Sequence, residues 1–130
     1  MIVLDASAAL EWLLNRPSAS KLEARLASEY GHVYAPHLID VEVLQVLRRF
    51  AREKTIGVER AHEAIEDFHA LAIGRHGHRR LVPRIWEIRA NLTAYDAAYV
   101  ALAETLDCPL VTHDARLARS PGHRARIELI

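Results

Sequence analysis

The sequence of 130 residues contains one cysteine, Cys108, so a disulfide bond within the chain is excluded. This is typical of a reducing compartment, and we expect a cytoplasmic protein. No apolar run reaches about 18 residues, so we expect no membrane-spanning helix. The apolar N-terminus has no basic residue before it and is interrupted by Asp5 and Glu11, which argues against a signal peptide.

Lysine is also scarce, because only Lys21 and Lys54 are present among 17 basic residues. The other basic residues are Arg, which suits planar recognition of phosphates and carboxylates, although a GC-rich genome explains the same bias. The formal net charge is zero and gives no sign of nucleic-acid binding. A glycine-rich phosphate loop is missing, which argues against nucleoside-triphosphate chemistry.

Short apolar runs alternate with amphipathic patterns along the whole chain. This alternation predicts a single α/β domain over residues 1–130, a three-layer α/β/α sandwich with a central parallel, Rossmann-like sheet of four to five short strands. The strands are expected at residues 2–4 (the central strand), 32–35, 79–82, 110–112 and 126–129 (an edge strand). The helices are expected at residues 8–14, 18–29, 37–53, 58–71, 84–91, 93–106 and 114–118.

Several residues are expected to set the ends of these elements. Ser7 is predicted to cap the first helix, and Gly31 to end the second. The first half of helix 37–53 is apolar almost all round, which predicts deep burial. Gly57 separates this helix from the next, so the two should form a helical hairpin.

Four acidic residues occupy positions where a solvated charge is not expected. Asp5 follows the apolar run Ile-Val-Leu, and Glu42 lies between two valines. Asp96 heads an apolar helix stripe, and Asp114 follows Leu-Val-Thr-His. Buried carboxylates are costly unless they have a partner or a metal, and a divalent cation is the simplest group that stabilises several together.

The predicted topology brings these acids together. Ligands of doubly wound sheets bind beyond the carboxyl ends of the strands where the strand order reverses. Asp5 ends the first strand, and Asp114 faces it if strand 110–112 lies alongside. Oxygen ligands favour Mg²⁺, with Mn²⁺ as an alternative, over zinc. Such ions support in-line displacement at phosphorus, so the expected chemistry is phosphodiester hydrolysis.

Each acid also has a structural interpretation. Asp5 and Asp114 could cap helices, and Asp96 could belong to a capping box opened by Thr93. Glu42 could pair with Arg49 on the same helix face. Four such acids at the expected ends of elements nevertheless favour a common site.

Other polar residues are weaker candidates. Ser7 and Thr112 are interpreted as caps and as supports of the ligands rather than as nucleophiles. The remaining candidates are interpreted first as solvated or structural residues: His62, Glu66 and His69 on one helix, His76 and His78 in a loop, His113 beside Asp114, and Trp12 and Trp86 in the core or an interface.

The segments around the four acids resemble the PIN-domain family, and within it the toxin subunits of VapBC toxin–antitoxin pairs. The first two matching segments are Ile2-Val-Leu-Asp-Ala-Ser-Ala-Ala-Leu10 and Ala35-Pro-His-Leu-Ile-Asp-Val-Glu-Val43. The other two are Leu92-Thr-Ala-Tyr-Asp-Ala-Ala-Tyr-Val-Ala-Leu-Ala-Glu104 and Cys108-Pro-Leu-Val-Thr-His-Asp-Ala-Arg-Leu117. Their order and spacing agree over essentially the whole chain.

This resemblance implies a Mg²⁺-dependent endoribonuclease with Asp5, Glu42, Asp96 and Asp114 as its acidic quartet. It also implies a cytoplasmic toxin held inactive by an antitoxin protein, commonly as a homodimer. Residues 57–84 match no motif, so substrate and antitoxin preferences are expected to differ there. Six arginines are candidates for contact with the RNA backbone: Arg48, Arg49, Arg52, Arg79, Arg80 and Arg116.

The leading hypothesis is therefore an RNA-hydrolysing toxin in which Asp5 and Asp96 bind the metal, while Glu42 and Asp114 complete the site and position or deprotonate the attacking water. One alternative is a small-molecule phosphohydrolase, but the aspartyl-phosphate type requires a second Asp two residues after the first, where Ser7 stands. The other alternative is an interaction module in which the acids hold a structural metal without nuclease activity.

Overall fold

The computed structural model describes residues 1–29 and 31–130. A five-stranded parallel sheet runs through the middle of the molecule in the order β3-β2-β1-β4-β5. The strands are β1 (Ile2–Leu4), β2 (Val33–Pro36), β3 (Ile73–His76), β4 (Leu110–Thr112) and β5 (Ile127–Leu129). The α/β class, the parallel sheet and the central position of the first strand are confirmed.

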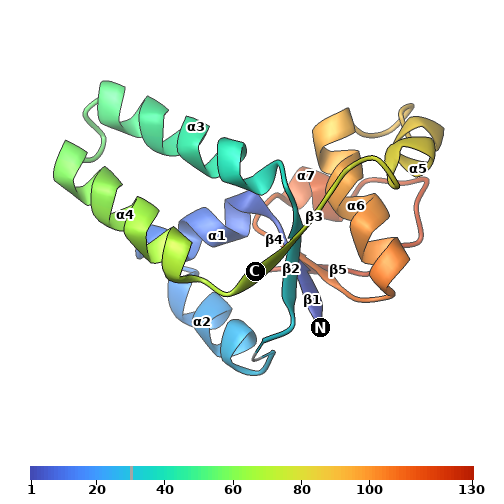
Figure 1. The fold of residues 1–130 in the computed structure, drawn as a ribbon, viewed down its shortest axis with the longest axis horizontal. Coiled ribbons are helices and arrows are strands. Elements are labelled where there is room, and N and C mark those ends of the chain that lie inside the picture. Colours follow the sequence, from blue (N-terminus) through green and yellow to red (C-terminus); the bar gives the residue numbers. More distant parts are fainter. Residues whose placement is uncertain (30) are drawn as a thin grey trace.

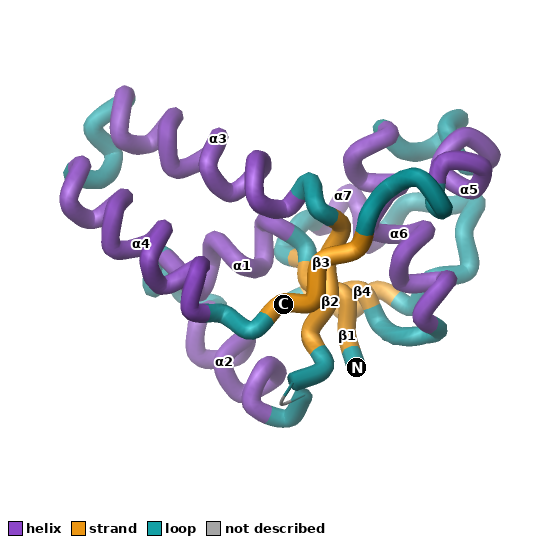
Figure 2. Tube along the Cα trace, viewed as in Figure 1, coloured by secondary structure: helices purple, strands orange, loops and turns teal. Residues whose placement is uncertain are grey.

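Helices cover both faces of this sheet. Helices α1 (Ala6–Leu13), α2 (Ala19–Ala27), α3 (Ile39–Arg52) and α4 (Val58–Ala70) lie on one side, with α3 and α4 as the predicted hairpin (Figure 1). Helices α5 (Val82–Glu87), α6 (Ala94–Leu106) and α7 (Ala115–Ala118) follow later in the chain, and α5 and α6 lie on the opposite side. Figure 2 shows the strands as a narrow middle layer between them. No described helix is long and apolar enough to cross a membrane.

The central strand fixes the first acidic residue in space. Ile2, Val3 and Leu4 are fully buried between β2 and β4. The Asp5 N–H continues the ladder by donating to the Val111 carbonyl at 3.0 Å. Asp5 therefore stands at the carboxyl end of the sheet, next to the place where the strand order reverses.

The prediction of a strand at residues 79–82 is wrong. The chain forms β3 at Ile73–His76 instead, and Val82 begins α5 with Pro83 in its first turn. The sequence of β3 is polar because β3 is an edge strand, so its pairing with β2 rather than an apolar pattern defines it. A Cβ on Gly74 would lie only 2.7 Å from the Tyr34 ring, so glycine allows this close approach.

Three further expectations differ from the structure. Ser7 is not a helix cap, because α1 already begins at Ala6 with Asp5 at the N-cap position. Helix α2 ends at Ala27, and Gly31 lies in the turn before β2. The first half of α3 is buried on one face only, which leaves Val41 64% and Leu44 44% exposed.

Candidate active site

The four predicted acids come together at the carboxyl end of the sheet. Asp5 follows β1 and Asp114 follows the adjacent β4, whereas Asp96 lies in the first turn of α6 and Glu42 in the first turn of α3. All four line one cavity of about 590 Å³. Their convergence, expected from the strand order, is therefore present in the structure.

Asp5 is the most deeply placed of these acids, with only 7% of its surface exposed. Its Oδ2 atom accepts hydrogen bonds from the hydroxyl of Ser7 and from Thr112 Oγ1, the latter at 2.7 Å. Burial raises the pKa of Asp5, and these hydrogen bonds offset part of the rise. Asp5 is thus held in one orientation, as the predicted support by Ser7 and Thr112 requires.

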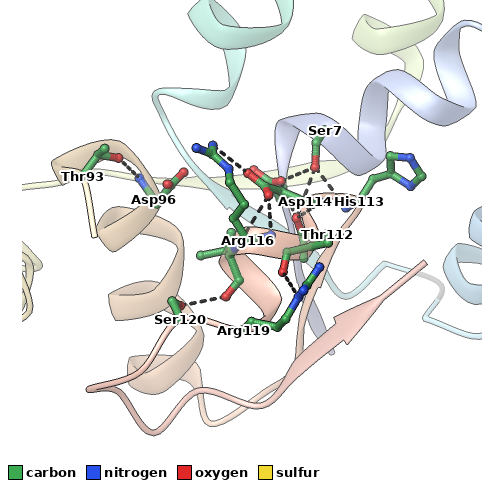
Figure 3. Close-up of polar contacts among 12 residues, drawn as sticks. Ser7, Thr93, Asp96, Thr112, His113, Asp114, Arg116, Arg119 and Ser120 are labelled. Carbon is green, nitrogen blue, oxygen red and sulfur yellow. Dashed lines mark hydrogen bonds and ion pairs between the residues drawn. The ribbon is translucent and has the colours of Figure 1, made fainter. Parts of the chain in front are cut away.

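The same two hydroxyls connect Asp5 with the end of β4. Thr112 Oγ1 accepts from the Asp114 N–H at 3.0 Å, and Ser7 Oγ accepts from the His113 N–H at 3.0 Å (Figure 3). Ser7 and Thr112 hydroxyls also lie 3.2 Å apart. This network joins the segments that carry Asp5 and Asp114 through fully formed hydrogen bonds.

Glu42 reaches the site from α3 and is held by α6. The Tyr99 hydroxyl donates to Glu42 Oε2 at 2.5 Å. No ion pair among the described residues joins Glu42 to Arg49, whose guanidinium carbon lies 5.3 Å from the centre of the Phe50 ring. Burial raises the pKa of Glu42 to about 7, against the lowering effect of the Tyr99 hydrogen bond, and the charges of Asp5 and Asp96 add to the rise. The alternative interpretation of Glu42 as a partner of Arg49 is therefore wrong, and Glu42 instead joins two helices.

Asp96 has both a capping neighbour and a place in the site. Thr93 caps α6 by accepting from the Asp96 N–H at 3.2 Å, as the capping-box interpretation predicts. The Asp96 carboxylate nevertheless lines the cavity. Burial raises the pKa of Asp96, and the negative charges of Asp5 and Asp114 raise it further. The cap and the site are thus compatible roles for one residue.

Asp114 also caps its own helix. Its Oδ1 accepts from the N–H groups of Arg116, at 2.7 Å, and Leu117, at 3.4 Å, and its Oδ2 lies 3.3 Å from the Arg116 guanidinium. Burial works to raise the pKa of Asp114, but the hydrogen bonds from Arg116 and Leu117 outweigh it and the pKa is lowered. Asp114 is therefore the acid of the four that most readily carries its charge.

The donor set of the cavity suits a hard cation because all four acids offer carboxylate oxygens. Glu42 and Asp96 each carry a raised pKa to which neighbouring carboxylates contribute, as expected for acids that share one site. In the present side-chain arrangement, no three Asp, Glu, His or Cys side chains of residues 1–29 and 31–130 are grouped to hold one ion. Metal binding here stays a prediction.

Among the weaker candidates, His113 lines the cavity. The others lie elsewhere. His62, Glu66 and His69 are exposed on α4. His78 has a structural role, because its Nε2 accepts from the Leu38 N–H at the start of α3 at 3.2 Å. Trp86 is 66% exposed, which excludes the core and leaves its interpretation as an interface residue a prediction. Trp12 packs against the core, and Arg79 and Arg80 are exposed before α5. His76 was expected in a loop but ends strand β3, where its ring packs against Tyr34.

Three residues that shape the site were not singled out from the sequence. One is Tyr99, which does not line the cavity but holds Glu42. Glu11 is 6% exposed and lines the cavity together with Arg16. The spacing of four residues between Ser7 and Glu11, which puts both on one face of α1, was the available signal.

Comparison with known proteins agrees with this architecture. Residues 2–122 match the PIN domain family. The DNA-bound VapBC structure from Salmonella typhimurium superimposes with a TM-score of 0.72 at 19% identity, covering 98% of this chain and 96% of that one. The chain therefore belongs to the PIN-domain family.

Its relatives place it more narrowly, among the VapC ribonucleases. Ribonuclease VapC9 of Mycobacterium tuberculosis is 51% identical over 118 residues, which are 91% of this chain and 89% of the relative. Ribonuclease VapC12 of the same organism is 41% identical over 130 residues, which are 100% of this chain and 99% of the relative.

Proposed function

We propose that this protein is an endoribonuclease that hydrolyses RNA phosphodiester bonds and acts as the toxin of a type II toxin–antitoxin system. The observation that carries the proposal is the meeting of Asp5, Glu42, Asp96 and Asp114 from four separate segments on one cavity. Relatives named as ribonucleases support RNA as the substrate. Each of the four matched segments retains its acid, which favours catalysis over a purely structural site.

We further propose that the four carboxylates hold Mg²⁺, or Mn²⁺ in its place. A bound cation would offset the mutual repulsion that contributes to the raised pKa values of Glu42 and Asp96. When bound, such an ion would polarise a phosphoryl oxygen of the RNA and lower the pKa of a water molecule. Asp5 and Asp96 are the first choices as ligands, with Ser7 and Thr112 orienting Asp5.

Glu42 is suited to accept a proton from the attacking water. A general base works best with a pKa near the working pH. Burial is the largest cause of the raised pKa of Glu42, and unlike the charges of Asp5 and Asp96 it is not neutralised by a cation. Tyr99 on α6 holds its carboxylate through a hydrogen bond. Asp114, which is ionised more readily, would complete the negative charge of the site and position the water.

Arginines around the cavity are proposed to contact the RNA backbone. Arg49 lines the cavity itself, and Arg48 and Arg52 are exposed on the same helix. Arg116 pairs with Asp114 at the cavity edge. These guanidinium groups could hold phosphates on either side of the bond that is cut. Arg79 and Arg80, which do not line the cavity, are the weaker candidates.

Partners are proposed on the same basis. Relatives and neighbouring structures are VapC proteins and VapBC complexes, which supports a cognate antitoxin. A homodimer is proposed as well, with apolar side chains available for it at Val82, Trp86 and Tyr95, which are 55%, 66% and 65% exposed. A cytoplasmic location would suit both the single cysteine and an RNA substrate.

The test is cleavage of defined RNA by the purified protein with Mg²⁺, with Mn²⁺ and with EDTA. We expect cleavage with either ion, none with EDTA, and a loss of more than about 100-fold in Asp5→Asn, because mutation of outer-shell partners alone costs 10–100-fold. Asp67→Asn, an exposed change on α4, should cleave like the wild type. Wild-type cleavage by a folded Asp5→Asn protein would contradict the catalytic assignment.

Induced expression distinguishes the nuclease toxin from an interaction module. Growth should stop when the wild type is expressed without antitoxin and continue with Asp5→Asn. Sequencing of the new RNA ends then identifies the cut RNA. Growth arrest by both forms would favour the interaction module instead.

A further inference from the structure

The cavity extends beyond the four acids along α1. Glu11 lies four residues after Ser7, which places it on the same helix face about 6 Å further along the axis. Ser7 bonds to Asp5, so Glu11 stands about one helical turn from the acidic cluster. The distance between the base and the phosphate of one nucleotide is of similar size.

Glu11 is buried but lacks a close partner. It is 6% exposed, and the nearest nitrogen atoms of basic side chains among the described residues are His113 Nε2 at 3.7 Å and Arg16 Nη1 at 4.0 Å. Both distances exceed those of a hydrogen bond. Buried carboxylates normally have hydrogen-bond donors on their oxygens. Glu11 therefore presents acceptor oxygens toward the cavity that it lines.

Cationic and planar groups form the neighbouring wall. The Arg16 and Arg49 guanidinium carbons lie 5.0 Å and 5.3 Å from the centre of the Phe50 ring, and all three residues line the cavity. Guanidinium planes and aromatic rings are the surfaces on which unpaired RNA bases stack. Glu11 thus has an unused acceptor beside surfaces that suit a base.

We propose that Glu11 and the adjoining Arg16, Arg49 and Phe50 form a base subsite that selects guanine next to the bond that is cut. The proposal rests on the RNA-cleaving function proposed above. Guanine presents two adjacent donors, N1–H and the 2-amino group, which can meet the two oxygens of one carboxylate. Its O6 acceptor lies next to them, where the Arg16 guanidinium can donate.

The other bases match Glu11 less well. Uracil offers one ring N–H flanked by two carbonyl oxygens, which would face the carboxylate unfavourably. Adenine and cytosine each offer a single exocyclic amine beside a ring acceptor. A site built to bind particular donors rejects bases that lack them, because its buried polar group is then left unpaired.

The test is binding of fluorescein-labelled pentanucleotides UUNUU in EDTA, measured by anisotropy, where N is each of the four bases or inosine. We expect G to bind about tenfold more tightly than A, C or U, as for a two-bond base contact. Inosine lacks only the 2-amino group, so its affinity should fall between G and the other bases. This comparison needs no variant.

Glu11→Gln removes one acceptor while keeping the side-chain size. We expect it to bind all five oligonucleotides within about twofold of one another. Glu66→Gln, which removes the same charge from the exposed face of α4, should keep the preference for G. Circular dichroism checks that both variants are folded. If Glu11→Gln does not fold, the affinities of the wild type for G and inosine test the subsite without it.

Two outcomes would overturn the subsite. One is equal affinity of the wild type for all bases, or binding of none. The other is a preference for G that survives in Glu11→Gln. Either result can occur while the wild type still cuts RNA with Mg²⁺, so failure of the subsite is distinguishable from failure of the nuclease function. Conversely, a preference for G without cleavage would reject the nuclease alone.

Discussion

The Tyr99 hydroxyl donates a 2.5 Å hydrogen bond to Glu42 Oε2 and thereby ties α6 to α3 across the acidic site. Tyr99 is fully buried, whereas Glu42 is only partly buried. The helix that carries Asp96 thus also holds Glu42. Because the two acids lie on helices from opposite sides of the sheet, this bond relates their positions directly.

Tyr99→Phe should move the pH dependence of cleavage. The Tyr99 hydrogen bond lowers the pKa of Glu42, which is about 7 with the bond present. Its removal should raise that pKa, so the acid limb of the pH–rate profile should shift to higher pH. We also expect a loss of about 1–2 kcal/mol in the free energy of unfolding. Tyr34→Phe, whose ring packs against His76, is the control. An unchanged acid limb would exclude Glu42 as the titrating base.

Asp96→Asn should abolish cleavage and yet stabilise the metal-free protein. Burial and the charges of Asp5 and Asp114 disfavour the ionised form of Asp96. At pH 7.5 the neutral amide should therefore raise the free energy of unfolding in EDTA by about 0.5–1 kcal/mol, allowing for solvent screening. Denaturant titration measures this change. A lower free energy of unfolding in Asp96→Asn would mean that the folded protein does not disfavour the ionised form of Asp96.

The free energy of unfolding of the metal-free protein should depend on pH because of Glu42. A pKa raised from 4.5 to about 7 means that the folded protein binds more protons than the unfolded chain between these values. This contribution to stability is complete below pH 4.5 and is lost as the pH rises toward 7. Glu42→Gln should therefore gain stability relative to the wild type across that window, as thermal melts in EDTA would show. A constant difference between the two proteins from pH 4.5 to 7.5 would refute the raised pKa, and Glu66→Gln controls for loss of a charge.

Thr112→Val should weaken the site through Asp5 and Asp114 together. Thr112 is fully buried, donates to Asp5 and accepts from the Asp114 N–H. Its loss removes a hydrogen-bond donor from the buried Asp5 carboxylate and leaves the partly buried Asp114 N–H without its acceptor, which costs about 1–3 kcal/mol. Affinity for Mg²⁺, followed by calorimetry, should fall by about 10–100-fold. Thr105→Val on the exposed side of α6 should leave that affinity unchanged, and equal affinities in both variants would remove Thr112 from the supporting network.

Much of the site could be predicted because its acids follow strong local signals. The run Ile2–Leu4 is apolar on both faces, so it could only be a buried central strand, and the next residue had to stand at its carboxyl end. Thr93 marks the start of α6, and the spacing from there places Asp96 in the first turn. That strand 110–112 lies beside the first strand was only a condition of the prediction, and the parallel pairing of β1 with β4 meets it.

The rest was decided by tertiary structure. Strand β3 has no apolar alternation of its own and exists because β2 offers it an edge. The buried face of α3, which leaves Val41 exposed, was selected by packing against α1 and α4. The sequence by itself determined the central strand and the positions of the four acids along the chain, because burial and caps act locally. Only the folded structure decided that Tyr99 holds Glu42 and that Glu11 faces the cavity, because a helical residue's partners depend on which face the neighbouring elements leave open.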